Sequence, residues 1–162
     1  MNKIITLEEA IEISDQLRDK KKRIVLAGGV FDIIHKGHLA FLQKAKTYGD
    51  VLFILIESDE AVKKKKGEMR PIHPQQKRAT ILEAVIAVDY IVLLQGILTN
   101  KDYEDFVITV KPAIIAATKG DPFAKEKKRQ AKLSNGTYKE IIDPIENVST
   151  SRLIDKIVMQ NV

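Results

Sequence analysis

The sequence predicts an α/β fold built on a parallel, five-stranded sheet with helices on both faces. Five short apolar runs alternate with longer segments in which apolar residues recur at helical spacing, and the runs cover residues 24–28, 51–56, 90–94, 112–117 and 138–142. The first run is apolar on both faces, as a central strand of a parallel sheet is. Strands that alternate with helices form parallel sheets with right-handed crossovers, so the order of the elements indicates the fold class.

The composition is typical of one globular domain, which we expect to span residues 1–162. The chain is 44% hydrophobic and 30% charged, which argues against a disordered or fibrous protein. It contains no cysteine, so disulfide bonds, cysteine metal ligands and thiol catalysis are excluded. The first residues carry no apolar signal region and no apolar run approaches the length of a membrane span. We therefore expect a cytoplasmic protein without a membrane partner.

The formal charge of +5 raises the alternative of a nucleic-acid-binding protein, whose affinity would fall steeply with salt. Lysines and arginines cluster at residues 20–23, 63–66 and 125–129. Aromatic side chains make up only 6% of the chain, which argues against a platform for stacking single-stranded bases. We therefore interpret most of these charges as solvated helix faces, with a few lysines that bind anions, and we expect no nucleic-acid partner.

Thr6 predicts the start of the first helix, because its hydroxyl can cap the helix while Glu9 closes a capping box. Apolar residues at helical spacing then mark the buried side: Leu7, Ala10, Ile11 and Leu17. After the strand at 24–28 and a loop with two histidines, a second helix is predicted up to Tyr48-Gly49. Its buried side is expected at Leu39, Leu42 and Ala45.

The run at 51–56 is the clearest strand, and it leads into a basic segment and a loop that contains Arg70-Pro71. Pro74 suits the first turn of the next helix. The apolar side of this helix is expected at Ala79, Leu82, Val85 and Ile86. The strand at 90–94 follows it.

The remaining strands are separated by two further helices. One is expected at 101–109, with Thr99 or Asn100 as its cap, and a polar one at 123–133, closed by an Asn-Gly pair. A last helix begins in the cap-rich segment 148–152. Its buried side is expected at Leu153, Ile154, Ile157 and Val158.

The stretch from Gly28 to His38 joins the first strand to the second helix and carries the strongest functional signal. A strand that ends in glycines before a helix N-terminus forms a phosphate site, because free backbone N–H groups and the helix dipole both point at the anion. His35 and His38 add hydrogen-bond donors that can follow charge onto a phosphate oxygen. This combination indicates phosphate chemistry on a nucleotide.

Three further polar segments directly follow predicted strands, at residues 58–67, 118–121 and 144–152. In open α/β sheets, ligands bind at the carboxyl ends of the strands, near the point where the strand order reverses. All four polar segments are therefore expected on one edge of the sheet. Because helices run back antiparallel to the strands, Arg78, early in its helix, is expected on the same edge.

Each of these elements also has a purely structural interpretation. The histidines would suit capping and surface positions, residues 63–66 a solvated helix face, and the hydroxyl residues at 149–151 a helix N-cap. A metal site is the other alternative for the histidines, but no Asp, Glu or Cys stands beside them at ligand spacing. Gly37 suits the close approach of a ligand better, so no metal ligands are assigned to the protein. His73 is expected on the surface, and Asp121 is either a turn residue or a ribose or base contact.

The segment Gly29-Val30-Phe31-Asp32-x-x-His35-x-Gly37-His38 resembles the G-x-F-D-x-x-H-x-G-H fingerprint of the cytidylyltransferase-like nucleotidyltransferases. Val148-Ser149-Thr150-Ser151 is similar to the second signature of this family, I-S-T-T before the last helix. Further family-like positions lie between them: Ser58-Asp59, Lys66-Gly67, Arg70-Pro71, Arg78 and Glu83. The resemblance covers nearly the whole chain and implies a Rossmann-like fold, the nucleotidylyl transferase fold.

Within this family the chain most resembles the adenylyltransferase domain of ADP-heptose synthases. The leading helix, the basic run before the first strand and the segment Lys119-Gly120-Asp121 are shared features, although one glycine of the usual K-G-G-D segment is missing. Glycerol-3-phosphate cytidylyltransferases carry an arginine four residues before their I-S-T-T segment. The corresponding place here is Pro144 or Ile145, which disfavours CTP.

The resemblance implies that a phosphate oxygen of the acceptor attacks the α-phosphorus of a Mg²⁺-bound nucleoside triphosphate in line, and that pyrophosphate leaves. Both the nucleophile and the leaving group are ionised, so the protein positions and neutralises them without a strong base. The implied catalytic residues are His35, His38 and Lys66, with Arg78 at the acceptor phosphate. The implied nucleotide-binding residues are Gly29, Val30, Phe31, Gly37, Asp121, Ser149, Thr150 and Ser151. Relatives in the family are often homodimers, which implies the same here.

Three functions therefore remain as predictions. The first is transfer of AMP from ATP to a sugar phosphate such as a heptose 1-phosphate. The second is a CTP-dependent cytidylyltransferase that acts on glycerol 3-phosphate or a related alcohol phosphate. The third is a nucleotide-binding module with little catalytic activity, against which the intact histidine pair and the intact Ser-Thr-Ser segment count.

Overall fold

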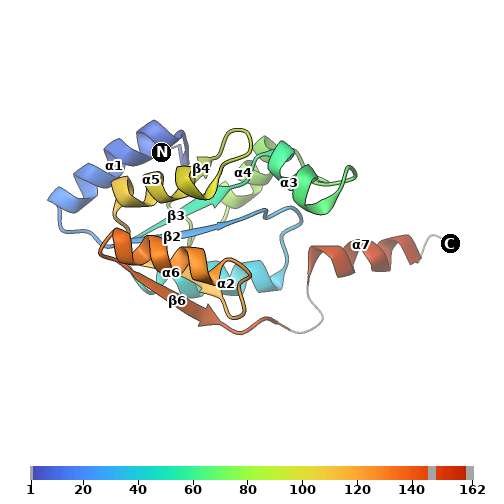
Figure 1. Ribbon diagram of the computed structural model, residues 1–162. Helices are drawn as coiled ribbons and strands as arrows, with labels where there is room; N and C mark the ends of the chain where they lie inside the picture. The colour runs from blue at the N-terminus through green and yellow to red at the C-terminus, as the bar shows by residue number, and fades with distance from the viewer. Residues whose placement is uncertain (1, 146–148, 160–162) are drawn as a thin grey trace.

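The structure is a computed structural model that describes residues 2–145 and 149–159. Its centre is a six-stranded sheet in the order β1-β4-β3-β2-β5-β6, in which every neighbouring pair is parallel (Figure 1). The strands are β1 (Ile4–Ile5), β2 (Ile24–Gly29), β3 (Val51–Ile56), β4 (Tyr90–Leu93), β5 (Ile114–Thr118) and β6 (Thr137–Ile142).

The expected number of five strands is wrong by one, because β1 adds a short edge strand. Ile4 pairs with Ile91 and Ile5 with Val92 of β4, and Thr6 then caps the first helix. A strand of two residues shows no periodicity that distinguishes it from a loop. The other strands agree with the sequence prediction to within two residues at each end.

The helices are α1 (Leu7–Asp19), α2 (Lys36–Lys46), α3 (Asp59–Lys66), α4 (Gln75–Glu83), α5 (Asn100–Val110), α6 (Ala124–Leu133) and α7 (Thr150–Met159). The capping box of Thr6 and Glu9 at the start of α1 is confirmed. α3 adds a helix to the basic segment after β3, because the Ser58 hydroxyl caps it by accepting the Ala61 N–H at 3.1 Å.

Helices cover both faces of the sheet, as predicted, because successive residues of the central strands point to opposite sides. Val25 and Ala27 of β2 pack in one cluster with side chains of α2 and α4. Ile24 and Leu26 pack in a second cluster with side chains of α1, α5 and α6. A strand buried on both faces needs consecutive apolar residues, which explains the unbroken apolar runs of the sequence.

The strand order reverses beside β2. The chain moves outward from β2 to β3 and β4, then crosses back to place β5 on the other side of β2. Val25 pairs with Ile114 of β5, while Gly29 pairs with Ile56 of β3. The carboxyl ends of β2 and β5 therefore border a crevice at the switch point, where ligands bind in folds of this type.

The expected burial of α7 is wrong. This helix lies beyond the carboxyl ends of the strands, apart from the sheet faces (Figure 1). Leu153 and Ile154 are half-buried, and the exposed fractions of Ile157 and Val158 are both 57%. Helical spacing predicts which side of a helix is apolar, but not whether a sheet lies beneath it. Val148, the first residue of the second family-like signature, lies outside the described residues.

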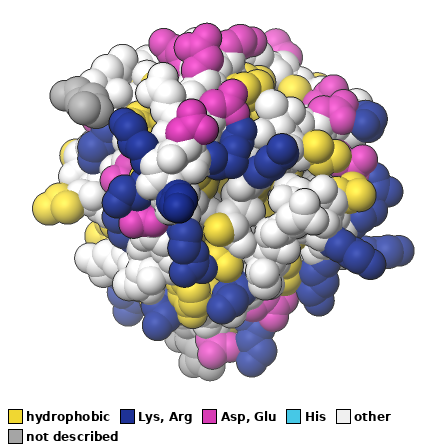
Figure 2. All heavy atoms as spheres, turned by 90° about the vertical axis from the view of Figure 1, so that its left-hand side faces the viewer, with side chains coloured by type: hydrophobic (Ala, Val, Ile, Leu, Met, Phe, Trp, Pro, Cys, Tyr) yellow, Lys and Arg dark blue, Asp and Glu magenta, His cyan; other side chains and the backbone are white. Residues whose placement is uncertain are grey.

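The end of the sheet at which the strands begin carries a mixed surface. Figure 2 shows lysine and arginine side chains interspersed with aspartate and glutamate there. The basic residues 20–23 directly precede β2, and Lys22 pairs with Asp50 at 3.5 Å. Among the described helices, none is long and apolar enough to cross a membrane.

Candidate active site

The loop after β2 turns sharply into α2. Phe31 adopts a left-handed backbone conformation with φ of 48°, and its buried ring lies against Gly29 and His38. A Cβ added at Gly29 would come within 3.1 Å of that ring, so a glycine leaves room for the turn. The loop thus leads from the end of β2 to the N-terminus of α2 and carries the histidines with it.

His35 and His38 form a stacked pair at the N-terminus of α2. Their ring centroids are 3.7 Å apart and their planes differ by 17°. His35 is the N-cap of the helix, where its Nδ1 accepts the backbone N–H of His38 at 3.3 Å. An accepting Nδ1 carries no proton, so the proton of the neutral ring is on Nε2. His35 therefore combines the expected capping role with an N–H donor on Nε2.

Both imidazoles are neutral near pH 7. Burial lowers the pKa of His35. Burial, and then the charge of His35, lower the pKa of His38 to about 4. The Nδ1 atom of His38 is buried and has no hydrogen-bond partner in the part of the chain that the structure describes. Such an unpaired polar atom is uncommon in folded proteins and marks a position of functional interest.

A cavity of about 400 Å³ opens at the switch point of the sheet. Its walls come from the glycines that end β2, the start of α2, the end of β5 and the segment after β6. Three of the predicted site residues line this cavity and not the neighbouring one, namely Gly29, Gly37 and Asp121. Lys127 of α6 also lines it and pairs with Asp121 at 2.5 Å.

A second cavity, of about 250 Å³, adjoins the first. The two cavities share the side chains or backbone of four residues: Val30, Phe31, His35 and His38. The remaining wall of the smaller cavity comes from the histidine loop, the end of α3, the following loop and the start of α7, with Asp32, Lys66, Arg70, Ser149, Thr150 and Ser151. The histidine pair therefore stands at the boundary between two compartments.

The start of α7 is attached to the histidine loop. Thr150 Oγ1 donates to the carbonyl of Ile33 at 3.3 Å, and the Ser149 hydroxyl accepts the Arg152 N–H at 3.2 Å. Ser149 thus caps the helix, and all three hydroxyl residues 149–151 line the cavity. The capping and the phosphate-binding interpretations use the same backbone N–H groups and do not exclude one another.

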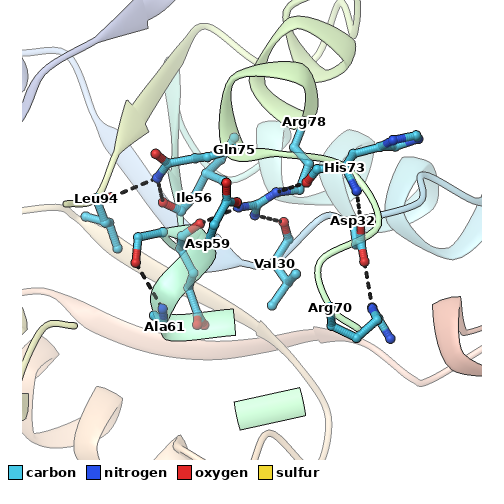
Figure 3. A network of polar contacts seen from close by, with 12 residues as sticks. Val30, Asp32, Ile56, Asp59, Ala61, Arg70, His73, Gln75, Arg78 and Leu94 are labelled. Carbon is cyan, nitrogen blue, oxygen red and sulfur yellow. Dashed lines mark hydrogen bonds and ion pairs between the residues drawn. The ribbon is translucent and has the colours of Figure 1, made fainter. Parts of the chain in front are cut away.

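Asp32 fixes the loop between α3 and α4 to the histidine loop (Figure 3). Its carboxylate is 1% exposed and accepts Arg70 Nε at 2.8 Å and the backbone N–H groups of Ile72 and His73 at 2.9 Å. Burial alone would raise the pKa of Asp32, but these hydrogen bonds and the charge of Arg70 hold the pKa below its ordinary value. The carboxylate is therefore ionised, and its two oxygens accept three hydrogen bonds.

Arg78 lies at the predicted edge of the sheet but not at a phosphate site, so its implied role at the acceptor phosphate is wrong. Its side chain is fully buried and lines neither cavity. The guanidinium donates to the carbonyls of Val30 at 2.6 Å, Glu57 at 2.7 Å and His73 at 3.0 Å, and it pairs with Asp59 at 2.8 Å (Figure 3). Because Arg78 lies near the start of α4, it does reach the predicted edge of the sheet, but its side chain is buried beneath the surface. Four of its five N–H donors are used on neighbouring groups, and its buried side chain does not reach either cavity as a contact for an acceptor phosphate.

The structure thus brings together every predicted site residue except Arg78. Sequence reasoning misses Arg70 and Lys127, which line the smaller and the larger cavity. Lys127 belongs to a basic run that the sequence analysis interprets as solvated. A signal is present, because the first turn of a helix that follows a strand lies at the carboxyl edge of the sheet.

Comparisons with known proteins agree with this geometry. Residues 26–156 match the protein family described as Cytidylyltransferase-like. The bifunctional protein HldE of a Nitratiruptor species is 40% identical over 151 residues, which are 92% of this chain and 30% of that protein. HldE of Helicobacter pylori (strain 26695) is 34% identical over 155 residues, 96% of this chain and 31% of that protein. This chain therefore spans about 30% of the length of such relatives.

Solved structures share the fold. The lipopolysaccharide core biosynthesis protein from Thermoplasma volcanium GSS1 is 29% identical and superposes with a TM-score of 0.60, over 76% of this chain and 97% of that chain. A pantoate-beta-alanine ligase from Francisella tularensis has a TM-score of 0.54 at 15% identity, over 98% of this chain and 78% of that chain, which concerns the fold alone. The motif, the cavities and the family match lead to one conclusion: this chain belongs to the cytidylyltransferase-like family of nucleotidyltransferases.

Proposed function

We propose that this protein transfers AMP from ATP to a sugar phosphate such as heptose 1-phosphate and releases pyrophosphate. The observation that carries the proposal is the pair of adjoining cavities with His35 and His38 on their common boundary. An enzyme that joins two phosphorylated substrates needs two such compartments with hydrogen-bond donors between them. The identity with the HldE proteins supports ATP and a heptose phosphate as the substrates.

In the proposed reaction, a phosphate oxygen of the acceptor forms a bond to the α-phosphorus of ATP. The bond from the α-phosphorus to the oxygen that bridges to the β-phosphate breaks, and its electron pair leaves with pyrophosphate. The nucleophile and the leaving group are already anions, so no proton has to be removed. The protein contributes orientation and stabilisation of the negative charge in the transition state.

We assign the residues of the two cavities as follows. His35 and His38 donate hydrogen bonds to the α- and β-phosphate oxygens, and the backbone amides of Val30 and Phe31 hold the α-phosphate region. Gly29 and Gly37 leave room for the nucleotide, and Asp121 contacts the ribose or the base. The smaller cavity receives the terminal phosphates of ATP and the phosphate of the acceptor. Lys66, Ser149, Thr150 and Ser151 bind these groups. The neutral state of both histidines supports this assignment, since each neutral ring keeps one N–H donor.

Mg²⁺ is expected to enter the site on the triphosphate. Within the described residues, no group of three or more His, Cys, Asp or Glu side chains is placed to hold a metal ion. The carboxylates that line the cavities are each paired with a cation: Asp32 with Arg70, Asp121 with Lys127 and Asp143 with Lys119. This donor set fits Mg²⁺ held mainly by phosphate oxygens and water, which would shield the charge of the triphosphate.

Two copies of the chain are proposed to associate. The support comes from α7, where Val158 is 57% and Met159 is 78% exposed although the helix has an apolar side. Light scattering of the chain should give the mass of two copies, and Val158→Glu should shift the mass toward one copy. The mass of one copy for the unaltered chain at all concentrations would contradict this assembly.

Pyrophosphate release tests the function. ATP and CTP are each combined with heptose 1-phosphate, other sugar phosphates and glycerol 3-phosphate. We expect release with ATP and a sugar 1-phosphate, dependent on Mg²⁺ and on the acceptor. Release only with CTP and glycerol 3-phosphate would replace the proposed substrates, and nucleotide binding without release from any pair would make the chain a binding module.

A further inference from the structure

Arg70 has the placement of a phosphate-binding residue, although the sequence analysis names it only as a family-like position and the roles assigned above leave it out. It lies in the loop between α3 and α4 and lines the smaller cavity, with its side chain 11% exposed. Among the described residues, the only hydrogen bond of the guanidinium runs from its Nε to the carboxylate of Asp32. Within that same part of the chain, the Nη nitrogens therefore keep their N–H donors without an acceptor. Figure 3 shows them on the side of the guanidinium away from Asp32.

Asp32 holds Arg70 in this orientation before any ligand is present. Its buried carboxylate also accepts the backbone N–H groups of Ile72 and His73, so the loop on both sides of Pro71 is fixed to it. These two amides stabilise the Asp32 carboxylate together with Arg70. Only the Nε–H of Arg70 is therefore engaged by Asp32, and its Nη groups stay available for a ligand. A guanidinium held by one nitrogen with its other edge open has the geometry that binds a phosphate through two N–H donors.

Other residues that line the smaller cavity suit the same ligand. They include the N-terminus of α7 with the hydroxyls of Ser149 and Thr150. Lys66 and Arg70 are the two cationic side chains among the residues that line this cavity, while Arg78 is fully buried and does not line it. Two cations, a helix N-terminus and hydroxyl groups around one cavity point to a ligand with several anionic oxygens.

We propose that the Nη groups of Arg70 bind a phosphoryl group in the smaller cavity and that Asp32 is the positioning residue that aims them. The inference rests on the proposed function only for the identity of that group, which belongs either to the terminal phosphates of ATP or to the acceptor. The shared chemistry is a phosphoryl group with ionised oxygens.

Calorimetry with the full chain tests this proposal without requiring turnover. Pyrophosphate and heptose 1-phosphate are the two probes. Arg70→Gln should weaken the binding of one probe by about 10- to 100-fold, the range for one lost charged hydrogen bond. The probe that is affected identifies the source of the phosphoryl group. Unchanged affinity for both probes, or no binding of either probe to the unaltered chain, would overturn the proposal.

Two further variants separate binding from folding. Arg70→Lys keeps the charge and should weaken the same probe by a smaller factor, so it carries the test if Arg70→Gln does not fold. Arg129→Gln is the matched control, because Arg129 also pairs with a poorly exposed carboxylate, that of Glu104, but lines neither cavity. It should leave both affinities unchanged, and an equal loss in this control would contradict a specific role of Arg70.

The role of Asp32 is tested through its dependence on Arg70. Asp32→Asn should weaken the same probe as Arg70→Gln. In the double variant the two effects should not add, since Asp32 acts through Arg70. A pyrophosphate-release assay should show the loss mainly in the KM of the same substrate. Additive effects would contradict the positioning role of Asp32. The phosphate contact of Arg70 is tested separately, by the calorimetry with Arg70→Gln.

Discussion

At the scale of single residues, burial decides what each polar side chain at the sheet edge can do. His38 is neutral because it is largely enclosed beside His35, which makes it a hydrogen-bond donor and not a cation. Arg78 is tolerated in full burial because its guanidinium donates to three carbonyls and pairs with Asp59. The sequence indicates which residues reach this edge, but it does not show which of them are covered.

Replacing His38 by alanine should lower kcat for pyrophosphate release by about 10²- to 10³-fold, the loss typical of one transition-state hydrogen-bond donor. The measurement is a steady-state assay at saturating ATP and acceptor. His73→Ala serves as the control, because the His73 side chain lines neither cavity. An unchanged kcat in His38→Ala would remove the assigned role.

The buried histidine also makes stability depend on pH. The unfolded chain binds a proton at the ordinary histidine pKa of 6.5, whereas the folded chain does so only near the pKa of about 4 of His38. The unfolded state therefore holds more protons between these values, and stability falls as the pH falls through this window. Urea denaturation at pH 7 and at pH 4 measures how much the free energy of unfolding falls between these two values. This fall should be smaller by up to about 3 kcal/mol for His38→Asn than for the unaltered chain. Equal losses would contradict a neutral, buried His38.

Arg78→Leu should lower the free energy of unfolding by about 3 kcal/mol or more, because it leaves the buried carbonyls of Val30, Glu57 and His73 without their donor. Urea denaturation measures the change. Lys77→Ala on the exposed side of the same helix should change it by less than about 0.5 kcal/mol. A folded, equally stable Arg78→Leu variant would show that the three loops do not depend on the guanidinium.

At the scale of elements, the sequence predicts those whose signal is local and repeated. α1 begins at its capping box, and β2 and β3 follow their apolar runs. β1 escapes sequence prediction because two residues carry no period, and its strand character comes only from pairing with β4. α7 has an apolar side as predicted, but its place beyond the sheet depends on the path of the segment before it.

The turn between α6 and β6 gives a test of element packing. A Cβ on Gly136 would lie 2.2 Å from the carbonyl oxygen of Pro112, so Gly136→Ala has to push β6 away from the start of β5. We expect a loss of about 1–3 kcal/mol in the free energy of unfolding by urea. Lys132→Ala, exposed at the end of α6, is the control and should be close to neutral. Unchanged stability in Gly136→Ala would contradict this close approach.

At the scale of the whole molecule, topology does more than any single motif. The parallel sheet is predictable from the alternation of strands and helices, and so is the convergence of the four polar segments on one edge, whereas the switch point beside β2 comes from the structure. The division of the site into two cavities is not, since it depends on how Asp32 holds the loop around Arg70 and how Thr150 meets Ile33. Such contacts join residues far apart in the chain and leave no spacing to detect.

The central claim is that an acceptor phosphate, held in one compartment, attacks the α-phosphorus of ATP held across the histidine pair. Heptose 1-phosphate with ¹⁸O in the non-bridging positions of its phosphate tests it most directly, with mass spectrometry of both products. The proposed reaction predicts that all label stays in the ADP-sugar, with one labelled oxygen between the two phosphorus atoms, and that pyrophosphate carries none. Label in pyrophosphate, or ATP cleavage without an ADP-sugar, would contradict it.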